Sequence, residues 1–141
     1  MKTEIIHVQP KTAVRKNAGF WMTHTSSIGL KPELYRKGAE SLAVIDMQVD
    51  YLVVLLKLFE VTGDAAYRDH VILCVNKFLP LFRAPLGVYW FMDAYTGDRK
   101  SEKICTKFLS LYTKLLLLLI ESLEGKKIYQ SCGLFDLSRD R

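Results

Sequence analysis

Residues 46–79 read DMQVDYLVVLLKLFEVTGDAAYRDHVILCVNKFL, and the expected fold follows from this stretch. Apolar side chains recur at three- and four-residue steps through its first half, which is typical of a helix with one broad buried face. We expect this helix to span about residues 40–61. A second helix is expected from Ala65 to about Leu79, where Pro80 would end it.

Residues 62–64 read Thr-Gly-Asp and connect these two helices. Gly63 is expected to take the left-handed position that ends the first helix, and the Asp64 side chain to accept from the free N–H groups that begin the second. The same tripeptide recurs at residues 96–98, ahead of a third helix expected over about residues 99–123. The chain is therefore expected to be mainly α, built from antiparallel helical hairpins.

The segments outside these helices show weaker patterns. Residues 4–8 are rich in β-branched side chains and could form a short strand, but two glycines in the next twenty-five residues favour loop, so we expect residues 1–31 to be irregular. Pro32 suits the first turn of a short helix, and residues 80–98 are expected to form a loop. The predicted organisation is one domain, residues 1–141, divided into an irregular N-terminal segment (1–31), a helical core (40–125) and a tail (126–141).

Composition places the chain among ordinary folded proteins. Half of the 141 residues are apolar and a quarter are charged, which suits one domain with a real core. The net charge of +5 is not concentrated in one basic block, so we expect no nucleic-acid partner. Cys74, Cys105 and Cys132 are too widely spaced for a disulfide set or a zinc motif, and we expect no metal and no cofactor.

Residues 115–120 form an apolar run that covers every side of the third expected helix. Lys107 and Lys114 interrupt the window of about 20 apolar residues that a membrane span needs, so we expect no membrane partner. A helix that is apolar all round is instead expected to be buried between neighbours, in this chain or in a second copy, which predicts a homo-oligomer or a protein partner. No signal-peptide pattern occurs in residues 1–15, and a cytoplasmic location is expected.

The stretch 46–79 resembles the helical-hairpin repeat of the (α/α) toroid carbohydrate enzymes, a superfamily of six-hairpin glycosidases, sugar 2-epimerases and uronyl C5-epimerases. In that repeat a helix ending in L-x-x-x-TGD-x-x-Y leads into a second helix. Here Leu58 or Phe59, residues 62–64 and Tyr67 stand in this arrangement. The resemblance implies a carbohydrate-active or carbohydrate-binding protein. Because a closed toroid needs several hundred residues, it also implies either a partial α/α toroid, a fragment lacking full activity, or a small helical bundle.

Candidate site residues follow from this resemblance. Whether the chain is an enzyme stays open; an enzyme of this kind would be a glycoside hydrolase or a sugar epimerase or lyase, and would use acid and base groups beside aromatic platforms. We predict Asp93 and His24 as catalytic residues and Tyr89, Trp90 and Tyr95 as substrate-binding residues for a sugar ligand. The alternative is that the aromatic residues close one end of a hydrophobic core, that Asp93 caps a turn and that His24 is an ordinary loop residue.

Asp46 and Asp50 lie four residues apart and could form an acid and base pair, but acidic residues are also favoured in a first helical turn by the helix dipole.

Two functions remain open. The first function is a carbohydrate-active or carbohydrate-binding protein. The second is a non-catalytic helical interaction or oligomerisation domain that docks through apolar helix faces.

Overall fold

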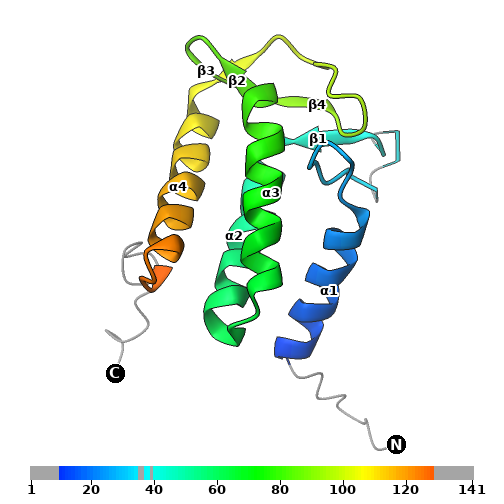
Figure 1. The fold of residues 1–141 in the computed structure, drawn as a ribbon. Coiled ribbons are helices and arrows are strands. Elements are labelled where there is room, and N and C mark those ends of the chain that lie inside the picture. Colours follow the sequence, from blue (N-terminus) through cyan, green and yellow to red (C-terminus); the bar gives the residue numbers. More distant parts are fainter. Residues whose placement is uncertain (1–9, 35–36, 39, 129–141) are drawn as a thin grey trace, which may run out of the picture.

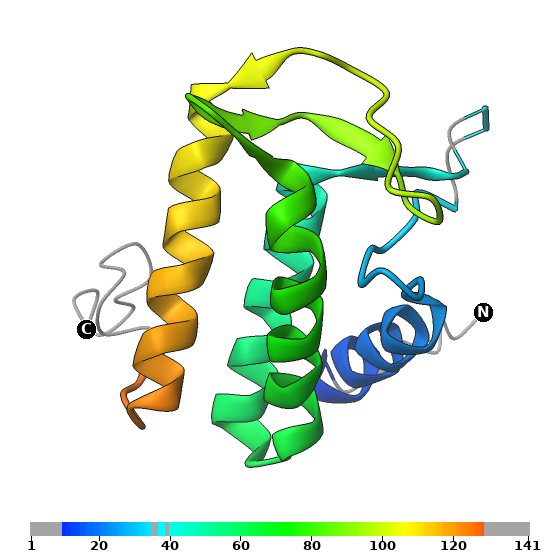
Figure 2. The ribbon, with the colours of Figure 1, turned by 45° about the horizontal axis from the view of Figure 1, so that its top comes forward.

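The computed structural model describes residues 10–34, 37–38 and 40–128, and this part of the chain is mainly helical. Its elements in chain order are α1 (Pro10–His24), β1 (Leu42–Val44), α2 (Ile45–Thr62), α3 (Ala65–Phe82), β2 (Arg83–Ala84), β3 (Gly87–Tyr89), β4 (Phe91–Asp93), β5 (Ile104–Cys105) and α4 (Thr106–Leu123). Helix α2 packs against both α3 and α4. The strands lie across one end of these three helices, and α1 lies on the side away from α4 (Figures 1 and 2).

The turn between α2 and α3 has the predicted chemistry. Gly63 takes a left-handed conformation with φ 72°, and its N–H donates to the Phe59 carbonyl at 2.8 Å. The Asp64 carboxylate accepts from the N–H of Ala66 at 3.0 Å, in the first turn of α3. The predicted turn at Gly63 and the predicted start of the second helix at Ala65 are therefore confirmed, and the first helix ends one residue later than expected, at Thr62.

Three short strands, β2, β3 and β4, occupy the region that we expected to be a loop, whereas β1 and β5 occupy the starts of two segments that we expected to be helical. Strand β1 pairs with β4, and β3 pairs with both β2 and β5. The second Thr-Gly-Asp repeats the local geometry of the first, since the Asp98 N–H donates to Thr96 Oγ1 at 3.2 Å just as the Asp64 N–H donates to Thr62 Oγ1 at 3.1 Å. No helix follows Asp98 directly, because the next residues join the strands: Arg99 bridges to Met92, and β5 forms on β3.

The expectation of an irregular segment over residues 1–31 is wrong for residues 10–24, which form α1. The apolar face of α1 is weak in sequence, yet Ala18 and Trp21 are buried. Pro32 begins no helix, because the Glu33 N–H donates to the Leu42 carbonyl at 2.9 Å and the chain runs alongside β1. The strand expected at residues 4–8 lies outside the described residues.

Three other helix boundaries differ from the prediction. Helix α2 begins at Ile45 and not near residue 40, because residues 42–44 pair with β4 as strand β1. Helix α3 continues past Pro80 to Phe82, because a proline near a helix end removes only one late hydrogen bond. Helix α4 begins at Thr106 and not at Arg99, because the intervening residues pair with the sheet. It ends where expected, with Gly125 at φ 76° and its N–H donating to the Ser122 carbonyl.

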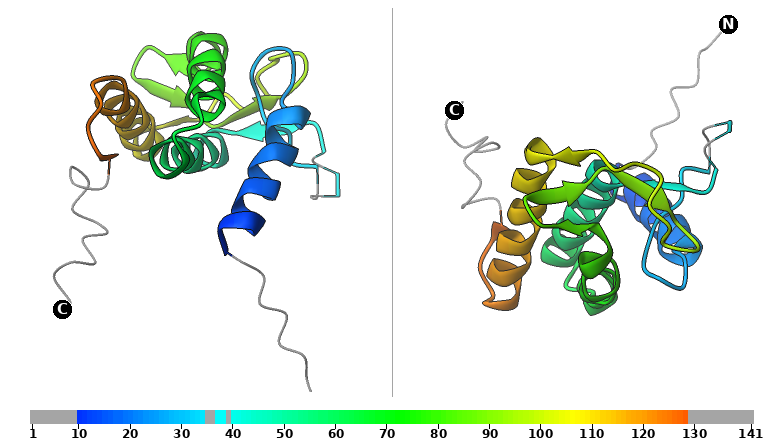
Figure 3. Two further views of the ribbon diagram at one scale, coloured as in Figure 1. Left: turned by 60° about the horizontal axis from the view of Figure 1, so that its bottom comes forward. Right: turned by 90° about the horizontal axis from the view of Figure 1, so that it is seen from above.

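One core joins the helices to the strands. Figure 3 shows the strands from above, crossing the ends of α2, α3 and α4. Fully buried side chains come from both layers: Phe78 and Phe82 from α3, Leu55 from α2, Leu115 from α4 and Met92 from β4. The strands therefore close one end of the layer formed by α2, α3 and α4.

Candidate functional site

The predicted sugar site is only partly assembled. Tyr89, Trp90, Asp93 and Tyr95 come from one ribbon, β3 and β4 with the residues that follow, at the strand end of the molecule. His24 ends α1, which is a different element. Four of the five residues are thus near one another because they are neighbours in sequence. His24 lies on another element and makes its own separate contacts.

Asp93 stabilises a turn. Its Oδ1 accepts hydrogen bonds from the N–H groups of Tyr95 and Thr96, both at 2.9 Å. These two backbone donors lower the pKa of the Asp93 carboxyl below its usual value. A carboxylate held in this way is a poor general acid near neutral pH, and the turn-capping alternative explains its contacts.

Two of the three aromatic residues predicted to bind sugar, Tyr89 and Trp90, are covered by neighbouring side chains. Arg99 donates to the Tyr89 hydroxyl at 2.8 Å, and its guanidinium carbon lies 4.5 Å from the centre of that ring. Trp90 packs against Phe108 of α4, with ring centres 5.9 Å apart. Tyr95 is about half exposed (52%), so it offers more free ring surface than the other two predicted platforms.

His24 closes the C-terminal end of α1. Its Nδ1 lies 2.7 Å from the Phe20 carbonyl, which can only accept, so Nδ1 carries the proton. Its ring also stacks on that of Phe20, with centres 3.9 Å apart. These contacts position His24 as a helix-ending residue.

A polar cluster that the sequence analysis missed surrounds His70. The Nε2 atom of His70 lies 3.3 Å from Thr25 Oγ1, from Tyr51 Oη and from Cys74 Sγ. Burial lowers the pKa of His70 and raises the pKa of Cys74 to about 12. A thiolate facing an imidazolium is therefore disfavoured, and the cluster acts as a neutral network that joins α2 and α3 to the residues after α1. The four-residue spacing of His70 and Cys74 on one helix was its only sequence signal.

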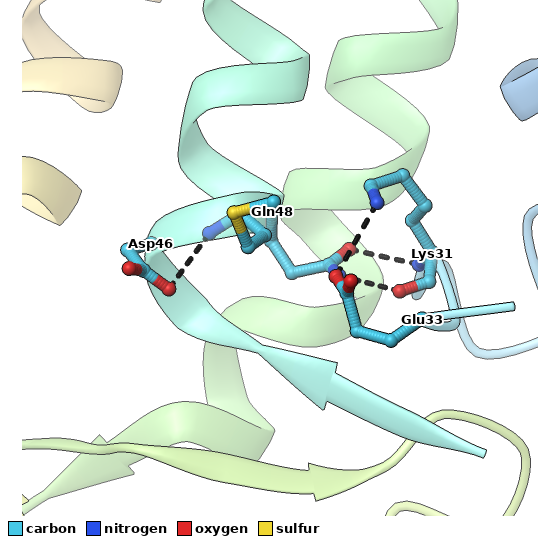
Figure 4. A network of polar contacts seen from close by, with 5 residues as sticks. Lys31, Glu33, Asp46 and Gln48 are labelled. Carbon is cyan, nitrogen blue, oxygen red and sulfur yellow. Dashed lines mark hydrogen bonds and ion pairs between the residues drawn. The ribbon is translucent and has the colours of Figure 1, made fainter. Parts of the chain in front are cut away.

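A second buried network fixes the segment before β1 (Figure 4). The Lys31 N–H donates to Gln48 Oε1 at 2.8 Å, and Gln48 Nε2 donates back to the Lys31 carbonyl at 2.6 Å. The Lys31 ammonium group pairs with Glu33 at 3.4 Å and lies 4.0 Å from the centre of the Trp21 ring. All the hydrogen-bond and ion-pair partners in this network come from the chain itself, which indicates a structural role.

The predicted acid pair of α2 is divided between two environments. Asp46 Oδ1 accepts from the N–H of Met47 at 2.9 Å in the first turn, as the helix-dipole alternative predicts, and Asp50 is exposed. Among the described residues, no group of three His, Cys, Asp or Glu side chains is arranged to hold a metal ion. Within the same residues, no helix has both the length and the apolar character needed to cross a membrane.

The most distinctive exposed feature is one side of α4. Leu115, Leu118 and Leu119 of its apolar run point into the core. The side turned away from the core carries what we term the outer α4 surface. It is formed by the three exposed residues Leu117, Ile120 and Leu123, whose exposed fractions are 57%, 51% and 54%, and by the half-buried Leu116 at its edge, which also packs against the core. The prediction of a helix apolar on all sides thus resolves into one buried face and one exposed face.

Charged residues border the outer α4 surface. Lys114 and Glu121 are seven residues apart on α4, so they lie on the same flank two turns apart, next to Leu117. Both are partly buried. An apolar strip with opposite charges along one flank is an arrangement that helix pairs use to fix orientation.

Comparisons with family models, with curated proteins and with solved structures each find no match to this chain.

Proposed function

We propose that this chain is a non-catalytic helical interaction module, and that it pairs with a second copy of itself through the outer α4 surface. The observation that carries the proposal is the exposure of Leu117, Ile120 and Leu123 on one side of a helix whose other side is core. Single exposed apolar residues are ordinary, but a contiguous strip at three- and four-residue spacing is typical of an interface.

The charges on the flank favour an antiparallel pair of α4 helices. In a two-fold pair, each residue of one copy meets its counterpart reciprocally. If Lys114 of one copy faces Glu121 of the other, the reverse contact forms as well, and the axis passes close to Leu117. In this register Ile120 of each copy packs against Leu116 of the other, so apolar contacts and charge contacts agree. A parallel pair would place like charges at matching heights.

The test is the solution mass, measured by light scattering after size exclusion, for the wild type and two variants. We expect a dimeric wild type and a monomeric Ile120→Glu variant, because the interface cannot bury an unpaired carboxylate. Val54→Glu is the matched control, since Val54 is an exposed apolar residue on α2 (45%) outside the outer α4 surface. A monomeric wild type at all concentrations, or dissociation by Val54→Glu but not by Ile120→Glu, would overturn the proposal.

The carbohydrate function stays a second proposal, together with the finer expectation of a partial α/α toroid. It is supported by the resemblance of residues 46–79 and by the grouping of Tyr89, Trp90 and Tyr95 on one ribbon. Arg99 over Tyr89 and Lys103, 5.9 Å from the centre of the Trp90 ring, would suit an acidic sugar better than a neutral one. A sugar would have to displace these cations from the ring faces, and for this reason the interaction function is preferred.

A further inference from the structure

A groove lies between the β2–β3 hairpin and the N-terminal half of α4, away from the outer α4 surface. Its volume is about 490 Å³, within the range of roughly 300 to 1,000 Å³ that is common for small-molecule sites. The hairpin forms because Arg83 pairs with Val88 and Ala84 with Gly87, leaving a turn at residues 85 and 86. Figure 2 shows this hairpin beside the first turns of α4.

The walls of the groove are mostly aliphatic. Leu79 comes from α3, Leu86 and Val88 from the hairpin, and Leu109 from α4. Leu86 is 81% exposed and Leu109 is 40% exposed, so apolar surface faces solvent on both sides of the groove. A ligand with an apolar chain would cover this surface and gain the free energy of its removal from water.

One cation stands at this apolar groove. Arg83 is exposed, and no carboxylate of the described residues lies within ion-pair distance of it. Its charge acts on Tyr112, which also lines the groove: burial raises the pKa of Tyr112 to about 12, and the nearby Arg83 opposes that rise. Arg83 thus lines the groove and, among the described residues, has no carboxylate partner that would keep it from an anion.

Tyr112 is already committed to the fold. Its hydroxyl donates to the Leu79 carbonyl at 3.3 Å, one of the last carbonyls of α3, which have no helical N–H partner. Polar recognition in the groove therefore falls to Arg83, whose planar guanidinium suits a carboxylate.

We propose that this groove binds a carboxylate with a straight apolar tail, such as a medium-chain fatty acid. The carboxylate pairs with Arg83, and the tail lies along Leu86, Val88 and Leu109. This site is separate from the outer α4 surface and does not depend on the proposed pairing of two copies.

The probe is decanoate below its micelle concentration, titrated into the full chain and followed by calorimetry and by amide NMR shifts. We expect saturable binding, with shifts concentrated in residues 83–88 and near Leu109. Arg83→Gln should weaken binding about tenfold or more, since it removes a charge-assisted hydrogen bond. Lys100→Gln, which removes another exposed cation outside the groove, should leave the affinity unchanged.

Two further measurements separate the parts of the site. Leu109→Gln, a change at a partly exposed position, should weaken decanoate binding while the helical circular dichroism stays the same. Decanol, which has the tail without the charge, should bind more weakly than decanoate and should not respond to Arg83→Gln. The proposal is overturned if decanoate does not saturate, if Arg83→Gln and Lys100→Gln behave alike, or if a peptide with a C-terminal leucine carboxylate binds more tightly than decanoate.

Discussion

Gln48 on α2 and Lys31, 17 residues earlier in the chain, exchange two buried hydrogen bonds at 2.8 and 2.6 Å. The Gln48 side chain thereby forms hydrogen bonds with both the N–H and the carbonyl of one residue, much as a neighbouring strand does in a β-sheet. The segment between α1 and β1 is held against α2 by this pair.

Replacing Gln48 with Leu should therefore destabilise the protein strongly. The change keeps the side-chain volume similar but leaves the N–H and carbonyl of Lys31 buried without partners, so we expect the free energy of unfolding to fall by about 2 to 4 kcal/mol. Urea denaturation measures it. The neighbouring exposed Met47→Ala should change it by less than about 0.5 kcal/mol, and equal effects of the two substitutions would contradict this role.

The two Thr-Gly-Asp sequences offer an internal comparison. Asp64→Ala should cost about 1 kcal/mol, because its carboxylate caps α3. Asp98→Ala should cost less, since no helix begins at Asp98 and its described hydrogen bonds use backbone atoms. Thermal unfolding of the two variants in parallel measures the difference; a larger loss at Asp98 would show that the cap is not what stabilises the first turn.

The His70 cluster predicts a dependence of stability on pH. Burial lowers the pKa of His70 in the folded state below its reference value of 6.5, so the unfolded chain binds the proton more readily. The contribution of His70 to the free energy of unfolding is therefore fully present above about pH 6.5 and is lost progressively as the pH falls below that value. The slope between pH 7 and 5 in urea denaturation should flatten in His70→Gln and persist in His24→Gln. An unchanged slope in His70→Gln would rule out this residue as its origin.

The register proposed for the α4 pair can be tested by exchanging charges. Lys114→Glu should raise the dissociation constant of the dimer by about two- to thirtyfold, because two ion pairs of roughly 0.2 to 1 kcal/mol each are lost. Lys114→Glu combined with Glu121→Lys should restore the wild-type value. Analytical ultracentrifugation gives both constants, and a double variant as weak as the single one would exclude the antiparallel register.

The carbohydrate proposal is tested most cleanly at Tyr95, because this ring is half exposed and its loss should not affect folding. If sugars stack on the ribbon, Tyr95→Ser should reduce binding in a panel of neutral and acidic oligosaccharides, with the acidic ones bound best by the wild type. Leu73→Ser, a change at an exposed apolar residue of α3 (50%), is the control. Wild-type protein that binds no member of the panel would remove support for this function.

The sequence by itself determined the features that depend on residues three or four positions apart. The end of α2 at Gly63, the cap at Asp64, and the end of α4 near Gly125 were predicted correctly, because capping and helix termination involve only neighbouring backbone groups. The repeat of leucines in α4 likewise predicted an apolar helix. It could not say which leucines face the core.

Tertiary contacts decided the rest. Helix α1 has a weak apolar pattern and forms against the core through Ala18 and Trp21, while strands of two or three residues are too short to leave a periodic signal. The groove at Arg83 is closed by residues from α3, the hairpin and α4. In the cluster at His70, the hydrogen bond between Thr25 and His70 joins side chains 45 positions apart. Such contacts depend on how the elements pack, and packing involves residues that no local pattern connects.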